Sequence, residues 1–487
     1  MFHLKWLILK RIFICLILGI SIFGLSYYNY VSAKSGYTPL TRLANNRKQK
    51  IDYQNLFDHS LYKSITVQFD ETTFEELVTS MEDYFLQFGS YQDNTLHKVD
   101  MTYHDGLGNH FTVEEVGFRT KSNTSRNIPR MLDWRGRTVY YQTSFQLQFN
   151  ETFDYEKDSN EYGVLNKREV FNLDQLNFEY SKAIDSYTDK AMISEAFAHY
   201  LYRQAGVKVS NASYGIVYFQ IGETIIGYGF YTFIEPIDNN FLSKNFKSNV
   251  IGDYGDLFKC TDLMGLADLS LNYEGLIGIN EAKINNRYTY ALKNHKQNNL
   301  RTDFSVMTQF IDHINDIDYF EKHQQNLLDI DAFIRAMSMG FLIGNSDDYR
   351  YNYNNFYLYF DVYTKRVTYI PFDLDSALGY GKHQDLTDNY GVYYPLNDSN
   401  ETAILVNLIL GIETYQTLYY QYLDDFVNEY FNYDDFYEEY LMAKSLYEAV
   451  LIAENHLGNQ VFSLRNTKWY FETKTMEVQK QLASLTQ

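Results

Sequence analysis

The sequence is most informative at Gly344-Asn-Ser-Asp-Asp-Tyr-Arg-Tyr-Asn-Tyr-Asn-Asn-Phe-Tyr-Leu-Tyr359 and at Ile370-Pro-Phe-Asp-Leu-Asp-Ser-Ala-Leu-Gly379. Residues 331–343, just before the first stretch, are apolar and predict a buried helix that ends at Gly344. Aromatic and β-branched residues predict strands at 356–360 and 366–371. We therefore expect a helix, a polar loop and a hairpin that leads into a second acidic loop.

This order should bring Asp347 or Asp348 close to Asp373. Phosphoryl transfer requires such groups, because one carboxylate accepts the proton of the acceptor hydroxyl while an Asn and a second Asp hold a metal ion between phosphates. Oxygen ligands are those that Mg²⁺ prefers. The residues alone leave two other interpretations open: tight turns with a helix cap at Asp375, or the Asp373-Leu-Asp375 pair as the metal-binding Asp-x-Asp of many glycosyltransferases.

Composition limits the class of protein. The chain has 487 residues, of which 45% are apolar and 21% charged, so it is long enough to bury a large core. The formal net charge of -20 argues against a nucleic-acid partner, because phosphate contacts need clustered Lys and Arg. Only Cys15 and Cys260 are present, and just one lies beyond the first apolar segment. We therefore expect no intrachain disulfide in the body.

The N-terminus contains a candidate membrane segment. Three basic residues precede an uncharged stretch from Ile12 to Val31, about the length that a helix needs to span a bilayer. Basic residues on the N-terminal side predict a cytoplasmic N-terminus and an extracellular body at the cell membrane. Cleavage after Ala33 would instead give a secreted protein. Residues 1–33 are thus interpreted as a signal anchor or a signal peptide.

Polarity and hydrophobic periodicity divide the rest of the chain into segments. Residues 34–60 are polar and basic and are interpreted as a juxtamembrane stalk, with the main domain at 61–400 and its C-terminal helical part at 401–487. We predict an antiparallel-dominated sheet in the first half, and helices from 401 to 455. The predicted strands are 65–69, 117–120, 144–149, 213–220 and 225–235; the predicted helices begin at Asp70 and after a capping box at Ser186–Asp189, the latter ending at Gly206.

Several of these blocks resemble, in the same order, the spore coat protein H (CotH) kinase family. The family pattern is approximately Gly-Asn-x-Asp, then Asn-Tyr-Tyr-Leu-Tyr, then Ile-Pro-Trp-Asp-x-Asp-x-x-x-Gly. This chain has Gly344–Asp347, then Asn355–Tyr359, then Ile370–Asp375 with Gly379. Upstream blocks that resemble the family are Gly117–Asn123, Ser144–Phe149, Phe171–Leu176, Gly206–Val207, Tyr231–Asp238 and Gly255–Lys259.

The resemblance implies an atypical kinase-like fold. Together with the residue patterns above, it predicts an α+β, two-lobed domain with a sheet-rich N-lobe and a helical C-lobe, preceded by one N-terminal membrane helix. It also implies an activity: an extracytoplasmic protein kinase that transfers the γ-phosphate of ATP to Ser hydroxyls of surface or envelope proteins, with Mg²⁺ or Mn²⁺. The expected partners are a protein acceptor at the cell surface and the membrane.

Site residues follow from the same resemblance. The implied catalytic residues are Asp347 or Asp348, the metal ligands Asn355, Asp373 and Asp375, and the nucleotide-binding residues Arg119, Lys121, Glu235 and Lys259. The loop after Asp347 is longer than the family spacing, so Asp348 stays an alternative to Asp347, and Asn352 an alternative to Asn355.

Two other functions stay open at this point. Ser122 stands where the family often has Gly, and Gln142 where it has a basic residue. These differences motivate a catalytically inactive kinase-like scaffold for cell-envelope or spore-coat assembly. A metal-dependent wall-polymer transferase is the other alternative, and it would prefer a nucleotide-sugar or lipid-linked donor to ATP.

Overall fold

The computed structural model describes residues 42–122, 126–181, 191–248, 254–278, 287–294, 304–378, 403–454, 457, 460–464 and 466–485. The helices are α2 (Arg42–Leu56), α3 (Glu71–Phe88), α4 (Asn160–Leu165), α5 (Ser194–Gln204), α6 (Asn239–Asn245), α8 (Ser305–Asn315), α9 (Ile317–Leu327), α10 (Ile330–Ile343), α11 (Tyr349–Asn352), α12 (Ile404–Leu410), α13 (Glu413–Glu429), α14 (Tyr433–Ala453) and α15 (Thr467–Leu485). The strands are β1 (Lys63–Phe69), β2 (His97–Asp105), β3 (His110–Thr120), β4 (Arg130–Leu132), β5 (Thr138–Tyr140), β6 (Phe145–Gln148), β7 (Gln175–Tyr180), β8 (Ala212–Ile221), β9 (Thr224–Ile234), β10 (Leu257–Cys260), β11 (Leu276–Ile277), β12 (Tyr290–Leu292), β13 (Phe356–Phe360) and β14 (Val367–Pro371).

The expected membrane segment at 12–31 and the expected capping box at Ser186–Asp189 lie outside the described residues. Within the residues that are described, no helix combines the length and the apolar composition that crossing a bilayer requires.

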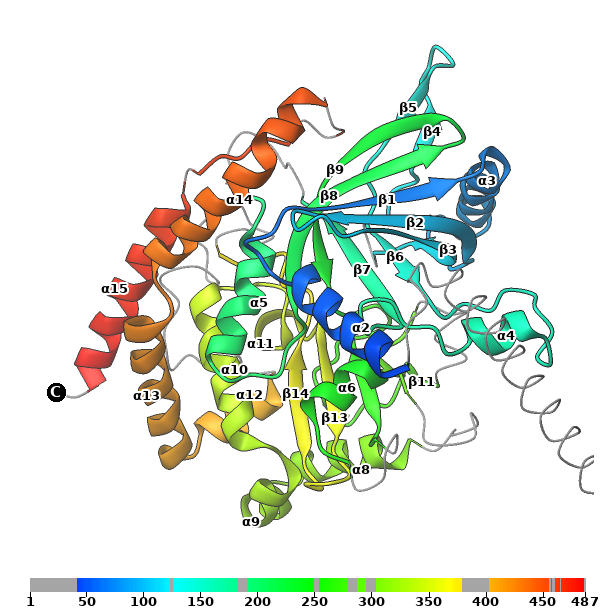
Figure 1. Ribbon diagram of the computed structural model, residues 1–487. Helices are drawn as coiled ribbons and strands as arrows, with labels where there is room; N and C mark the ends of the chain where they lie inside the picture. The colour runs from blue at the N-terminus through cyan, green and yellow to red at the C-terminus, as the bar shows by residue number, and fades with distance from the viewer. Residues whose placement is uncertain are drawn as a thin grey trace, which may run out of the picture.

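Seven strands of the first half form a closed barrel in the order β1-β2-β3-β6-β7-β9-β8 (Figure 1). All neighbours are antiparallel except β1 and β8, whose parallel pairing closes the sheet with Ile65 opposite Val217. Side chains of β1 are alternately buried and half-buried, as the period of a strand requires. Closure leaves the barrel without open edges, and its interior is filled by aromatic rings such as the stacked pair Phe145 and Phe178.

Helix α3 begins where the sequence predicts. Asp70 is its N-cap, and the Asp70 carboxylate accepts a hydrogen bond from Thr73 N. A cap of this kind contributes about 1 kcal/mol to stability. The helix ends at Gly89, whose left-handed φ of 73° suits glycine. Its apolar face, which includes Phe74 and Met81, is buried in the barrel core.

The second half combines a sheet with helices. The sheet has five strands in the order β11-β12-β10-β13-β14, and helices α8 to α15 pack with it around one large core. Helix α10 is buried and ends at Gly344, as predicted. The predicted mixed α+β class, with a sheet-rich and a helical part, is therefore confirmed; the additional sheet strands β10, β11 and β12 were not predicted.

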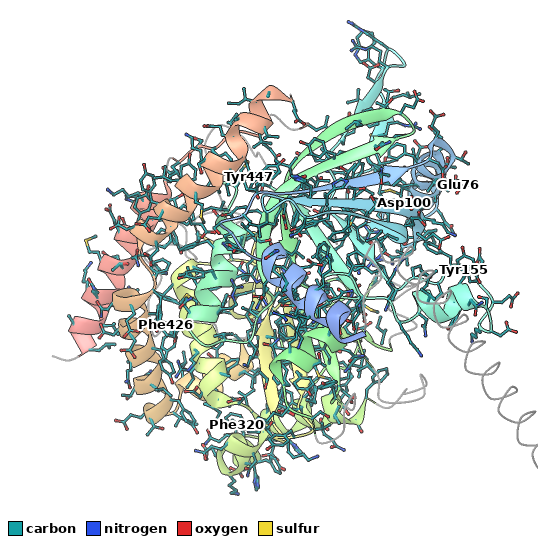
Figure 2. The ribbon with its side chains drawn as sticks, in the orientation of Figure 1. Glu76, Asp100, Tyr155, Phe320, Phe426 and Tyr447 are labelled. Carbon is teal, nitrogen blue, oxygen red and sulfur yellow. The ribbon has the colours of Figure 1, made fainter. Side chains whose placement is uncertain are left out.

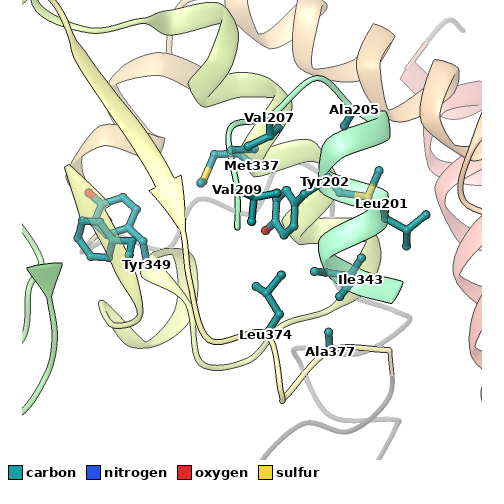
Figure 3. Packing of buried hydrophobic residues seen from close by; sticks show 14 of the residues in the cluster. Leu201, Tyr202, Ala205, Val207, Val209, Met337, Ile343, Tyr349, Leu374 and Ala377 are labelled. Carbon is teal, nitrogen blue, oxygen red and sulfur yellow. The ribbon is translucent and has the colours of Figure 1, made fainter. Parts of the chain in front are cut away.

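Helix α5 belongs to this second core. In the sequence this helix lies between predicted strands of the first half, but its buried residues pack with α10, as Leu201, Tyr202 and Ala205 do near Met337 and Ile343 in Figure 3. The helix also contacts β8. It therefore joins the barrel to the helical part, which a sequence period alone does not reveal.

The C-terminal helices hold the two parts together. Tyr447 on α14, labelled in Figure 2, accepts a hydrogen bond from Lys63 N (3.0 Å). Its hydroxyl also lies 3.1 Å and 3.2 Å from the carbonyl oxygens of Leu61 and Tyr214. Within the described residues 403–454, helices α12, α13 and α14 confirm the predicted helical pattern, and α14 packs against the barrel.

The expectation of a stalk at residues 34–60 is wrong for its second half, because residues 42–56 form helix α2, which is attached to the body. Gln49 donates to Glu169 O and accepts from Asn172 N, and the hydroxyl of Tyr53 donates to Glu235 (2.9 Å). The folded body thus includes residues before Leu61. Polar side chains make these contacts, so the helix lacks the apolar period by which sequence analysis recognises a packed helix.

Candidate active site

The polar loop after α10 is shaped by residues with unusual backbone angles. Gly344 ends the helix with a φ of 63°, and Tyr353 and Asn355 have φ values of 54° and 56°. Non-glycine residues rarely adopt this region, and those that do cluster at functional sites. These turns lead the chain out of the short helix α11 and back into β13.

Asp347 lies at the centre of an amide cluster. Asn352 Nδ2 donates to Asp347 Oδ1 (2.5 Å), and Asn355 Nδ2 lies 3.2 Å from Oδ2 and 3.0 Å from the carbonyl oxygen of Asp347. The Asp347 side chain is half-buried. Both asparagines that the sequence left open therefore bind the same aspartate, and they fix the orientation of its carboxylate.

Asp348 has a different position. Its side chain is buried and accepts a hydrogen bond from Arg350 N, which makes it the N-cap of α11. Burial raises the pKa of Asp348 from its ordinary 3.8 to about 7, although the nearby Arg350 guanidinium opposes this shift. The geometry therefore assigns Asp348 a structural position and leaves Asp347 as the aspartate of the loop with a partly exposed carboxylate.

We predict that Asp348→Asn changes the pH dependence of the free energy of unfolding. Asn is also a good N-cap, so the variant keeps the cap of α11 and loses only the carboxyl group that titrates. The folded parent keeps a proton on Asp348 that the unfolded chain releases above pH 4, so the parent loses stability as the pH rises through 7. Between pH 5 and pH 8 the variant should gain about 2–3 kcal/mol relative to the parent. Urea unfolding at both pH values measures this difference. An equal change in the free energy of unfolding between pH 5 and pH 8 for parent and variant would contradict the prediction.

The hairpin brings Asp373 to the same loop, as predicted. Phe372 N donates to Asn355 O (3.0 Å), and Asn345 Nδ2 lies 3.5 Å from Asp373 O. Asp373 has a left-handed φ of 57°. Asn355 Oδ1 is buried and has no hydrogen-bond partner among the residues that the structure describes. A buried acceptor without a donor costs free energy, so this oxygen is free to bind a cation.

A metal ion fits this donor set. Among the described residues no three His, Cys, Asp or Glu side chains are arranged to bind a metal, but Mg²⁺ needs only one or two carboxylates beside substrate phosphates and water. Asp373 and Asn355 Oδ1 would provide the protein oxygens. The half-buried Asp375 accepts a hydrogen bond from Ser376 Oγ (3.1 Å). Burial, followed by the charge of Asp375, raises the pKa of Asp373.

Basic side chains from the barrel and from the second sheet meet next to this loop. Lys121 follows β3 and Lys259 lies on β10, and their ammonium groups lie 5.2 Å and 4.9 Å from the centroid of the Phe372 ring. Burial lowers the pKa of both lysines, whereas the charge of Asp373 raises it. Arg119 is near enough to lower both pKa values further, so three of the predicted nucleotide-binding residues are close together.

The sequence missed Lys293, which follows β12. Burial lowers its pKa, as does repulsion from Lys259, Arg119 and Lys121. Four cations therefore gather at one place in a protein with a net charge of -20. Lys293 lies in a short segment without a recognisable motif, so sequence reasoning had no signal for it.

Two carboxylates were also missed. Glu179 on β7 forms a salt bridge of 3.6 Å with Lys121. Glu195 in the first turn of α5 is buried, with Oε1 lacking a hydrogen-bond partner among the described residues. Burial, followed by the charges of Glu179, Asp375 and Asp373, holds its pKa well above the usual range. The one sequence signal for Glu195 was its position next to the apolar residues Ala196 and Phe197.

Comparison with known proteins identifies the family of the chain. The family model described as CotH kinase protein matches residues 135–450, which is more than half of the chain. The chain belongs to the CotH kinase family. The region shared with CotH kinases contains Asp347, Asn355, Asp373, Lys259 and Lys293, so both the carboxylate loop and half of the cation cluster lie inside it.

Among solved structures, this member of the CotH kinase family is similar to the crystal structure of a Helicobacter pylori proinflammatory kinase, CtkA. The match covers 64% of this chain and 92% of the other, with 10% sequence identity and a TM-score of 0.25, which is too low to support an argument. No curated protein matches the chain.

In this CotH-family protein, Glu235 has other partners than the remaining predicted nucleotide-binding residues. Glu235 is fully buried, forms a salt bridge of 2.8 Å with Lys244, and accepts hydrogen bonds from Tyr53 and Asn211. Tyr53 lies on α2, so this network attaches the N-terminal helix to the barrel. The sequence identified the strand that leads to Glu235, but in the described structure the side chain binds Lys244, Tyr53 and Asn211.

We therefore predict that Glu235→Gln affects stability and leaves ATP binding unchanged. Loss of the buried negative charge removes the partner of Lys244 and weakens the bond from Tyr53, which should lower the free energy of unfolding by about 2 kcal/mol. Denaturant unfolding and calorimetric ATP titration measure the two effects. Tyr53→Phe, which removes the hydrogen bond that the hydroxyl donates to Glu235 and the one that it accepts from Asn211, should cost about 1–2 kcal/mol. A large loss of ATP affinity in folded Glu235→Gln would contradict this assignment.

Proposed function

We propose that this CotH-family protein is a metal-dependent kinase that transfers the γ-phosphate of ATP to Ser hydroxyls of surface or envelope proteins. One observation carries the proposal: the carboxylate and amide loop of Asp347, Asn355 and Asp373 lies beside the cluster of Arg119, Lys121, Lys259 and Lys293. A phosphoryl-transfer site needs cations that bind the phosphates. It also needs carboxylates that bind a metal ion and accept a proton.

The cations have a binding role. Burial, followed by repulsion from the neighbouring cations of this cluster, lowers the pKa of Lys121, Lys259 and Lys293. An anion such as a nucleoside triphosphate relieves that repulsion, so the phosphates contribute favourable binding free energy. Glu179 holds Lys121 in position through their salt bridge.

Asp373 and Asn355 Oδ1 would hold the metal ion, which neutralises negative charge between the phosphates when it is bound. Asp347 is the proton acceptor. As the Ser oxygen forms its bond to the γ-phosphorus, the bond between that phosphorus and the oxygen shared with the β-phosphate breaks, and the hydroxyl proton passes to an Asp347 oxygen. Asn352 and Asn355 orient that carboxylate through their amide groups.

The extracytoplasmic location remains part of the proposal. It is supported by the uncharged stretch from Ile12 to Val31 and by the basic residues before it. Protease added to intact cells should digest the body if it faces outward. A body that stays intact until the cells are lysed would contradict this location.

The function is tested on the full chain, purified in detergent because of the predicted membrane segment. ATP is titrated by calorimetry with and without Mg²⁺ or Mn²⁺, and γ-labelled ATP is supplied with casein as a Ser-containing acceptor. Metal-dependent binding with label on Ser is the expected result. No binding at millimolar ATP would overturn the proposal. Binding without transfer to casein or to the chain itself would favour an inactive scaffold, and a preference for a nucleotide-sugar would favour a wall-polymer transferase.

A further inference from the structure

A small hairpin projects from the barrel. Strands β4 and β5 pair only with each other, and Figure 1 shows them extending beyond the ends of their neighbours. The register places Arg130 opposite Tyr140 and Met131 opposite Val139. None of the site residues described above lies on this hairpin, so its surface is available for another role.

The hairpin is held rigidly at its base. Both guanidinium NH₂ groups of Arg130 donate to the carboxylate of Glu75 on α3, and the ring of Tyr140 lies 6.3 Å from that of Phe74. Tyr141 N donates to Pro129 O (2.9 Å). Two contacts to α3 and one across the strands fix the direction in which the hairpin projects.

The turn is also ordered. The carboxylate of Asp133 accepts hydrogen bonds from Arg135 N (2.8 Å) and from Arg137 N and Nε (2.9 Å and 2.8 Å). Gly136 supplies the left-handed φ of 73° that the turn requires. A tip that is already ordered loses little conformational entropy when it binds a surface.

The tip exposes large apolar side chains. Trp134 is 84% exposed, Leu132 66% and Met131 42%. Arg135 stacks on the Trp134 ring, with its guanidinium carbon 4.2 Å from the centroid, and it forms no salt bridge in the described part of the chain. Together with Arg137 and Asp133 it gives the tip a net positive charge on a protein whose total is -20. The tip thus combines an apolar end with a local positive charge.

We propose that this tip inserts into the interface of a bilayer that contains anionic lipid. Trp and Leu side chains gain free energy at the level of the lipid headgroups, where Trp rings concentrate, and Arg side chains bind lipid phosphates. The charge of the tip complements such a surface, although the charge of the whole protein does not.

The shape of the tip favours a lipid surface over an acidic protein. The hairpin spans only residues 130–140, fewer than the roughly 20–30 residues that each partner contributes to a stable protein interface. A fluid headgroup layer accepts a projecting Trp without a preformed pocket. One such tip binds weakly, so it orients a body that is held near the membrane by other means.

The test uses the full chain with Trp6→Phe and Trp469→Phe, which leaves Trp134 as its one tryptophan. The protein is reconstituted in vesicles that contain brominated phosphatidylcholine, with or without phosphatidylglycerol, and Trp134 fluorescence is recorded. We expect strong quenching that depends on phosphatidylglycerol. Arg135→Gln should reduce the ratio of quenched to unquenched protein by about fivefold, the effect of one basic residue at an anionic surface.

Leu132→Ser should also reduce the quenching, whereas Leu271→Ser, at a site that is 64% exposed in another part of the chain, should not. Unquenched Trp134 in vesicles with phosphatidylglycerol would overturn the proposal. So would quenching that Leu132→Ser and Leu271→Ser reduce equally. A Trp134 emission shift on addition of poly-glutamate, without quenching in vesicles, would assign the tip to an acidic protein partner and overturn the membrane assignment.

Discussion

Asp373→Ala is expected to abolish metal-dependent ATP binding, with an affinity at least about 100-fold weaker than that of the parent. Asp373 follows a residue that is hydrogen-bonded to Asn355, and its charge acts on both lysines, so its loss removes a metal ligand and leaves Glu179 as the other carboxylate whose charge acts on Lys121 and Lys259. A loss of this size corresponds to about 3 kcal/mol of binding free energy. Calorimetric titration of ATP with Mg²⁺ measures it directly.

The same titration of the parent at different pH values provides a second check on Asp373. Burial and the charge of Asp375 raise the pKa of Asp373 to about 7, and only the ionised carboxylate binds a cation. Metal-dependent affinity should therefore fall as the pH drops below 7, up to about tenfold per unit. Asp375→Ala is the comparison variant: it should affect binding less than Asp373→Ala, and it should move the fall in affinity to lower pH, because the charge of Asp375 raises the pKa of Asp373. Unchanged ATP affinity in folded Asp373→Ala would contradict the position of the metal.

Asp347→Asn is expected to lower the rate of phosphate transfer by about 10³-fold while ATP binding stays within a few-fold of the parent. The substitution keeps the size of the side chain but removes the proton acceptor, and general-base catalysis contributes about 10²–10⁴ to a rate. Transfer of labelled phosphate to casein measures the rate, and calorimetry measures ATP affinity on the same preparation.

Asp348→Asn is the control for this prediction. Its side chain caps α11 and is buried, so the variant should keep most of the transfer rate. Loss of transfer in folded Asp348→Asn, with activity retained in Asp347→Asn, would reverse the two assignments. Loss of ATP binding together with transfer in Asp347→Asn would instead make Asp347 a nucleotide or metal ligand.

Local sequence signals predicted the elements that carry the site. The apolar run of α10, its end at Gly344 and the two strands of the β13–β14 hairpin lie where the residues predict them. Strand alternation and helix caps depend on neighbours along the chain, which is why β1 and the Asp70 cap of α3 were also found. The loop motifs placed Asp347, Asn355 and Asp373 together for the same reason, since one hairpin connects them.

Residues that differ only in burial could not be separated in this way. Asp347 and Asp348 are adjacent and chemically identical, yet one carboxylate is partly exposed between two asparagines while the other is enclosed as a cap. Glu235 sits in a block that resembles the family, but the packing of α2 determines its partners. A side chain's surroundings are set by elements far away in the sequence, and no local pattern records them.

The sequence by itself determined the family, the mixed α+β class and the three residues at the ends of the hairpin, because these follow from short motifs and from periodic burial. Only the tertiary structure decided that Lys293 joins Arg119, Lys121 and Lys259, that Glu195 is enclosed near Glu179, Asp373 and Asp375, and that α2 is part of the body. These facts depend on closure of the barrel and on its packing against the second sheet, which bring together side chains separated by more than a hundred residues and set the desolvation and charge that each one experiences.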